Sequence, residues 1–156
     1  MGVSGSGKTT VGVKLAAVLH ATLLEGDRYH PPENIRKMEA GIPLEDADRW
    51  PWLRAIGAAI DAERGRGHDA VVTCSALKQS YRDLLAQGRP ELRFVYLKGS
   101  EALIQERLAR RTGHFMPPSL LRSQFAALEE PRDAITVDIA PPPDEIVAAI
   151  LEGLGR

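Results

Sequence analysis

The sequence predicts a three-layer α/β domain with a parallel β-sheet, and two observations support this fold class. Short apolar runs alternate along the chain with segments of helical periodicity, the pattern of parallel strands joined by crossover helices. A glycine-rich segment ends in Lys8 and Thr9 at the start of the first helical segment, which is typical of a phosphate-binding loop. No internal repeat or linker divides the 156 residues, so we expect a single domain over 1–156.

In the first half of the chain, helical spacing of Val11, Leu15, Val18 and Leu19 predicts a helix over Lys8–His20. The apolar run Ala21–Leu24 predicts a short strand. Prolines and glycines between 27 and 50 predict a loop with a small helical part. A helix over Pro51–Arg64 and a buried strand over Ala70–Cys74 follow.

In the second half, the spacing of Leu77, Tyr81, Leu84 and Leu85 predicts one helix, and two more are predicted over Ser100–Arg111 and Ser119–Leu128. A last helix is predicted to begin at Pro143, with Ile146, Ile150 and Leu154 on its apolar face. The predicted strands are Leu92–Leu97 and Ala134–Ile139.

The glycine-rich segment fits the pattern G-x-x-x-x-G-K-[ST] of P-loop proteins at every defined position. Its glycines let backbone N–H groups turn toward phosphate oxygens, and the following helix adds positive charge at its N-terminus. Lys8 is expected to reach the β- and γ-phosphates of ATP, and the Thr9 hydroxyl to bind Mg²⁺. The residues predicted to bind the nucleotide are Gly2, Val3, Ser4, Gly5, Ser6, Gly7, Lys8, Thr9 and Thr10.

The strand that normally delivers such a loop is missing, because only Met1 precedes Gly2. We expect the natural start to lie upstream, so that about ten further residues supply a strand. Two alternatives are a sheet that closes over the gap and a strand donated by a partner. Without that strand, we expect low stability and weak nucleotide binding.

Composition excludes several function classes. A net charge of -1, from 20 basic and 21 acidic residues, argues against nucleic-acid binding. No apolar run is long enough for a membrane helix. The single cysteine, Cys74, cannot form an intramolecular disulfide and is expected to be a buried apolar residue. These features predict a cytoplasmic protein.

Several further segments, taken with the phosphate loop, resemble bacterial-type gluconate kinases over nearly the whole chain. The matching pieces are Gly26-Asp27-x-x-His30, Asn34-x-x-Lys37-Met38-x-x-Gly41-x-Pro43-Leu44, Asp46-x-Asp48-Arg49-x-Pro51-Trp52-Leu53, Cys74-Ser75-Ala76-Leu77-Lys78, Tyr81-Arg82-Asp83-Leu84-Leu85 and Gly113-His114-Phe115. The resemblance implies an ATP-dependent kinase that converts gluconate to 6-phosphogluconate, commonly as a homodimer.

Asp27 is the candidate for activating the acceptor hydroxyl. It follows the end of a predicted strand, where ligands bind in open α/β sheets, and its carboxylate suits proton acceptance or positioning of Mg²⁺ through water. A turn or helix cap is the structural alternative. The candidates for binding the acceptor's carboxylate and hydroxyls are His30, Arg49, Lys78, Arg82 and His114. Lys78 and Arg82 are expected to share a helix face, and Asp46 and Asp48 to hold Arg49.

A lid is predicted at about 107–119. Arg107, Arg110 and Arg111 are spaced to form one cationic helix face, with Gly113 as a hinge. The spacing also fits a solvated helix end. The family resemblance favours Arg107 and Arg111 as groups that stabilise the transferring phosphoryl group. Gln124 fits either a ligand contact or packing. The rival functions are a shikimate or nucleotide kinase and a non-catalytic nucleotide-binding protein.

Overall fold

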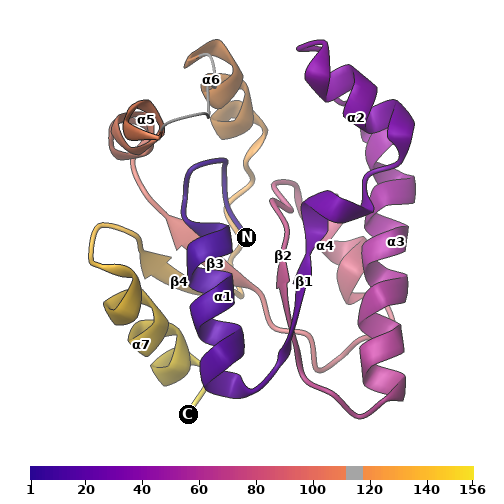
Figure 1. Cartoon of the computed structure of the whole chain (residues 1–156), viewed down its shortest axis with the longest axis vertical. Helices are drawn as coiled ribbons and strands as arrows, with labels where there is room; N and C mark the ends of the chain where they lie inside the picture. The colour runs from indigo at the N-terminus through magenta and orange to yellow at the C-terminus, as the bar shows by residue number, and fades with distance from the viewer. Residues whose placement is uncertain (112–117) are drawn as a thin grey trace.

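The computed structural model of the chain describes residues 1–111 and 118–156 (Figure 1). Helices and strands alternate, as the sequence predicts. The elements are α1 (Lys8–Leu19), β1 (Thr22–Glu25), the 3₁₀ helix η1 (Gly26–Tyr29), α2 (Pro32–Glu39), α3 (Asp46–Gly65), β2 (Ala70–Thr73), α4 (Gln79–Ala86), β3 (Val95–Lys98), α5 (Glu101–Arg110), α6 (Pro118–Ala127), β4 (Ile135–Asp138) and α7 (Pro143–Gly153).

The described strands form two parallel pairs. β1 pairs with β2, with Thr22 opposite Ala70, and β3 pairs with β4, with Val95 opposite Ile135. Over residues 1–111 and 118–156, β2 and β3 are not paired with each other. The parallel α/β class is therefore confirmed, but the sheet is split in two.

The gap between β2 and β3 lies where the missing strand is expected. Only the first two residues bridge it: Leu97 N–H donates to the Met1 carbonyl over 3.0 Å, and Gly2 N–H donates to the Ser75 carbonyl over 3.2 Å. Behind this bridge is a cavity of about 560 Å³, lined in part by α1, β2 and β3. The sheet has not closed over the gap, and an upstream start stays a prediction.

Each strand pair has its own hydrophobic core. One core joins α1, β3, β4, α5 and α7, and its least exposed members include Ile104, Ile139 and Ile150. The other joins β1, β2, α3 and α4 around Leu53 and Ile56. Because separate cores hold the two pairs, each pair stays covered by helices although no strand connects them.

The helix predicted to begin at Pro51 begins at Asp46 instead. Glu45 and Asp48 form a capping box, in which each side chain accepts a hydrogen bond from the other residue's backbone N–H. This cap starts α3 more than a turn early, so Pro51 lies inside the helix. Arg49 consequently projects from a helix rather than from a loop.

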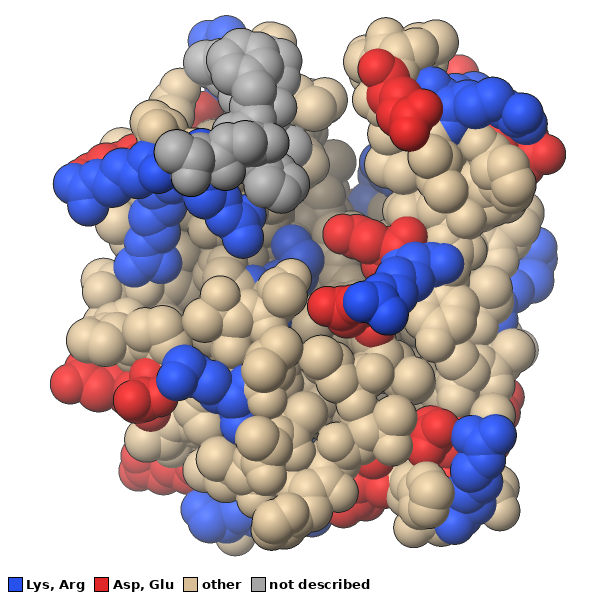
Figure 2. Space-filling model, in the orientation of Figure 1, with Lys and Arg blue, Asp and Glu red and all other residues tan. Residues whose placement is uncertain are grey.

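The two halves of the molecule face each other across a cleft. In Figure 1, α5 and α6 stand on one side and α2 and α3 on the other, with the loop before α1 between them. Figure 2 shows the surface hollowed between these halves, with basic side chains within the hollow. In the described part of the chain, no helix is both long and apolar enough to cross a bilayer.

Candidate active site

The loop before α1 has the backbone that a phosphate cradle needs. Gly5 and Gly7 have φ angles of 80° and 95°, in the left-handed region that favours glycine. Lys8 folds back over the loop, and its Nζ donates to the carbonyls of Gly2 and Val3, each over 3.0 Å. Burial lowers the pKa of Lys8, a half-buried residue.

The N-terminus of α1 fits an anionic ligand. Gly7 precedes the helix and supplies no side-chain cap, and the first turn contains no acidic residue. The first N–H groups of any helix lack partners within the helix, so here they are available to phosphate oxygens. Thr9 and Thr10 are exposed in this first turn. These residues fit the triphosphate of ATP, and the Thr9 hydroxyl suits a Mg²⁺ ligand.

Gln124 connects α6 to the phosphate loop. Its Oε1 accepts a hydrogen bond of 2.7 Å from the backbone N–H of Ser4, 120 residues earlier in the chain. This bond to the loop backbone is neither of the two roles expected of Gln124, a ligand contact or packing. The loop is thus supported from the side of the predicted lid.

Asp27 lies in η1, directly after β1, and is exposed. Burial lowers the pKa of both Lys8 and His30, and the nearby negative charge of Asp27 opposes this shift in each. For both residues, burial is the larger effect and the net shift is downward. The predicted acid–base group and the phosphate-binding lysine therefore occupy the same site.

His30 is held in place by stacking and by an amide. Its ring stacks on Trp52, with centroids 4.2 Å apart and planes 12° apart. Asn34 Nδ2 lies 3.2 Å from His30 Nδ1 and also donates to the Asp48 carbonyl over 2.8 Å. The Trp52 indole donates to the Gly26 carbonyl over 2.8 Å, which fixes the stacking partner beside η1. Trp52 is therefore a buried packing residue that also orients His30.

Arg49 and Lys78 meet around the hydroxyl of Tyr81. Arg49 Nη1 donates to Tyr81 Oη over 2.8 Å, and Tyr81 Oη donates to the Asp46 carboxylate. Lys78 Nζ donates to the same carboxylate over 3.0 Å. The hydrogen bond from Tyr81, followed by that from Lys78, lowers the pKa of Asp46. We call Asp46, Arg49, Lys78 and Tyr81 the acceptor cluster.

The expectation that Asp46 and Asp48 hold Arg49 needs correction. Asp48 Oδ2 pairs with Lys37 Nζ at 2.9 Å and caps α3, while Asp46 binds Tyr81 and Lys78. Arg49 is bound by the phenol instead. The repulsive charge of Arg49 contributes to lowering the pKa of His30, so the cluster lies near the Asp27 end of the site.

Arg82 does not reach this cluster, contrary to its predicted role in acceptor binding. It is 1% exposed, and its guanidinium donates to the carbonyls of Ala76, Leu77 and Glu129. Lys78 is the N-cap of α4 rather than a residue within it, so the expected shared helix face does not form. Arg82 instead fixes the turn between β2 and α4.

The lid arginines differ in their surroundings. Arg107 Nη2 donates to the Ile139 carbonyl over 2.5 Å, at the end of β4, and Arg110 pairs with Glu106 at 2.5 Å. Arg111 is exposed, and its charge contributes to lowering the pKa of Lys8. The charge of Arg111 thus acts on the lysine of the phosphate loop, in the direction expected of a cation in its surroundings. His114 and Gly113 lie outside the described residues.

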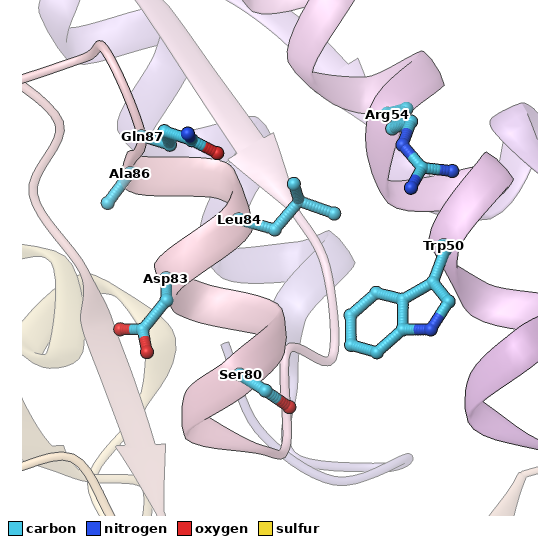
Figure 3. A pocket seen from close by; sticks show the side chains of 7 residues that line it. All are labelled: Trp50, Arg54, Ser80, Asp83, Leu84, Ala86 and Gln87. Atoms are coloured by element: carbon cyan, nitrogen blue, oxygen red, sulfur yellow. The ribbon is translucent and has the colours of Figure 1, made fainter.

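Two other features stand apart from this site. Burial raises the pKa of the Cys74 thiol to about 11, which fits the buried apolar role expected of it. A surface hollow of about 580 Å³ lies between α3 and α4, where Trp50 and Leu84 point toward one another (Figure 3). None of the predicted site residues lines that hollow, so the acceptor cluster and the phosphate loop remain the candidate active site.

Comparisons with known proteins agree with this arrangement. The family described as AAA domain matches residues 1–131. The thermoresistant gluconokinase of Escherichia coli is 47% identical over 156 aligned residues, which cover 97% of this chain and 89% of that protein. The chain belongs to the gluconokinase family of P-loop kinases. The gluconokinase of Gluconobacter oxydans is 51% identical over 85% of this chain and 75% of its own length.

Solved structures agree with this membership. A crystal structure of a gluconokinase from Sinorhizobium meliloti 1021 superposes with a TM-score of 0.91 and 53% sequence identity, covering 100% of this chain and 89% of that chain. A shikimate kinase from Aquifex aeolicus has a TM-score of 0.60 at 20% identity, which shows a shared fold only. The predicted gluconate kinase resemblance and the P-loop kinase fold are thus confirmed.

Sequence reasoning missed the functional part of Tyr81. Its helical spacing with Leu77, Leu84 and Leu85 gave an interior position, and the ring is indeed 2% exposed. A tyrosine at an apolar position still needs a partner for its hydroxyl when it is buried. The sequence therefore indicates that the buried Tyr81 hydroxyl needs a hydrogen-bonding partner, but it does not identify Arg49 and Asp46 as those partners.

Proposed function

We propose that this gluconokinase-family protein transfers the γ-phosphoryl group of ATP to the primary hydroxyl of gluconate, giving 6-phosphogluconate and ADP. The observation that carries the proposal is the near-complete alignment, at 47% and 53% identity, with two proteins named gluconokinase. The geometry supports it, because the protein holds both a phosphate-binding loop and a cluster of cationic side chains suited to a carboxylate.

Each residue has a task that follows from its position. The Asp27 carboxylate accepts the proton of the attacking hydroxyl as the new O–P bond forms and the bond to ADP breaks. Lys8 and the N–H groups at the start of α1 bind the phosphate oxygens, and Arg111 adds positive charge from the lid. When bound at Thr9, Mg²⁺ neutralises part of the triphosphate charge. His30, Arg49 and Lys78 hold the acceptor's hydroxyls and carboxylate.

Further parts of the proposal rest on the family alone or on residues outside the described ranges. His114 contributes to acceptor binding, and Arg107 stabilises the transferring phosphoryl group. The protein works in the cytoplasm as a soluble enzyme, and a homodimer is its expected state. It needs neither a nucleic acid nor a membrane partner.

Coupled measurement of ADP release tests the proposal. We expect magnesium-dependent turnover with gluconate and background rates with shikimate or nucleoside monophosphates. Lys8→Met should lower kcat by about 10²-fold or more, because it removes charge from the transferring group. Lys14→Met is the matched control, since Lys14 lies on the same helix and pairs with exposed Asp144. Equal rates for all acceptors would contradict the proposal.

A further inference from the structure

Tyr81 belongs to the acceptor cluster but has no role in the proposed chemistry. Its ring is buried on α4, with 2% of the residue exposed, while its hydroxyl reaches the cluster. The oxygen accepts a hydrogen bond from Arg49 on α3 and donates one to Asp46 at the start of the same helix. The Tyr81 hydroxyl therefore both accepts and donates a hydrogen bond, and each partner is a charged side chain.

The same ring also lies beneath both cations of the cluster. The Arg49 guanidinium carbon is 5.4 Å from the ring centroid and Lys78 Nζ is 5.7 Å from it. Cations at this distance are attracted to the face of an aromatic ring. Trp50 packs edge-on against Tyr81, with centroids 5.5 Å apart, and so limits movement of the ring.

The charges of the acceptor cluster leave a net positive site. Arg49 and Lys78 contribute two positive charges and Asp46 contributes one negative charge. Tyr81 and Lys78 both donate to the Oδ1 atom of Asp46, and no hydrogen bond or ion pair joins this carboxylate to Arg49 in the described part of the chain. Arg49 thus keeps donors for a second, incoming carboxylate, and bidentate pairing with carboxylates is what guanidinium groups do best.

We propose that Tyr81 is a positioning residue that sets Arg49 to recognise the carboxylate of a sugar-acid acceptor. The inference deepens the proposed function and rests on it. The phenol holds the guanidinium at one rotamer and keeps Asp46 from pairing with it. Without the hydroxyl, Arg49 regains rotamer freedom, and Asp46 loses its hydrogen bond to Tyr81 and becomes free to compete for the guanidinium.

The test is a double-mutant cycle on kcat/KM for gluconate, using Tyr81→Phe and Arg49→Met. We expect Tyr81→Phe alone to raise the KM for gluconate by about tenfold, as for loss of a hydrogen bond to a charged group. Its kcat and its KM for ATP should stay near those of the wild type. In the Arg49→Met background, the same substitution should change kcat/KM by less than about twofold, because the group it positions is gone.

Tyr96→Phe is the matched control. Tyr96 is also buried, and its hydroxyl donates to the Glu130 carboxylate over 3.2 Å, away from the acceptor cluster. It should leave the KM for gluconate unchanged. Circular dichroism and melting curves verify that all variants are folded, and the phenylalanine ring preserves the packing of α4.

Two results would separate the possible failures. A wild-type enzyme that does not phosphorylate gluconate would overturn the proposed function, and this inference with it. If the wild-type enzyme phosphorylates gluconate, the proposed function stands, and two outcomes for the variants would overturn only the role of Tyr81. Those outcomes are no effect of Tyr81→Phe, and an equal effect with and without Arg49.

Discussion

Among single residues, burial determines which cationic side chains are available to a ligand. Arg82 and Lys78 are four positions apart, but their surroundings differ completely. Arg82 is 1% exposed and bonded to backbone carbonyls, whereas Lys78 is half-buried and bonded to a carboxylate at the site. The position of Lys78 before α4, rather than in it, points the two side chains to different places.

Substituting Arg82 should therefore affect stability rather than substrate binding. Arg82→Met leaves the carbonyls of Ala76, Leu77 and Glu129 without their donor, so we expect the free energy of unfolding to fall by at least about 2 kcal/mol. Urea denaturation measures the change. The exposed Arg54→Met is the control. Unchanged stability with a raised KM for gluconate would return Arg82 to the acceptor site.

The residues of the phosphate loop could be predicted from sequence because their spacing is local and each type has a required conformation. Gly5 and Gly7 have the positive φ angles that the pattern demands. The partner of Arg49 could not be predicted in the same way, because Tyr81 lies 32 residues away and the contact depends on how α3 packs on α4. The spacing of residues along the chain does not predict a contact between residues so far apart in sequence.

Between elements, one side chain ties the lid side of the cleft to the nucleotide site. α6 contacts α5, and its Gln124 side chain accepts a hydrogen bond from the Ser4 backbone of the phosphate loop. The helix itself was predictable from its apolar spacing, with bounds of 119–128 against the observed Pro118–Ala127. Its tether to the loop was not, because a side-chain bond to a backbone group 120 positions away leaves no periodic pattern.

Removing this tether should weaken nucleotide binding. Gln124→Leu eliminates the acceptor for the Ser4 N–H, so the loop samples more conformations before ATP binds. We expect the Kd of a non-hydrolysable ATP analogue to rise by about 2- to 10-fold, the cost of one neutral hydrogen bond. Titration calorimetry measures it. Gln105→Leu, on the exposed face of α5, should bind like the wild type. A Gln124→Leu variant with unchanged Kd would show that the loop needs no such support.

Across the whole molecule, two strand pairs are joined by the first two residues, by α1, which packs on β1, β2 and α7, and by bonds of Leu77 and Arg82 to Glu129. The Met1 and Gly2 backbone bonds, together with packing of α1, connect β1 and β2 to β3 and β4. The alternation of strands and helices predicted the α/β class and all four described strands to within a few residues.

An added strand that fills the gap between β2 and β3 should stabilise the protein. We expect a designed extension of about six β-branched residues ahead of Met1 to lie between β2 and β3 and bond to both. Each buried apolar side chain contributes about 1.5–3 kcal/mol, so the free energy of unfolding should rise by at least about 3 kcal/mol. Binding of ATP should tighten as well, since the strand fixes the base of the phosphate loop. A glycine-serine extension of equal length is the control, because it cannot fill the cavity of about 560 Å³. If both extensions melt at the temperature of the original chain, the cavity does not accept a strand and the two pairs are already as stable as this fold requires.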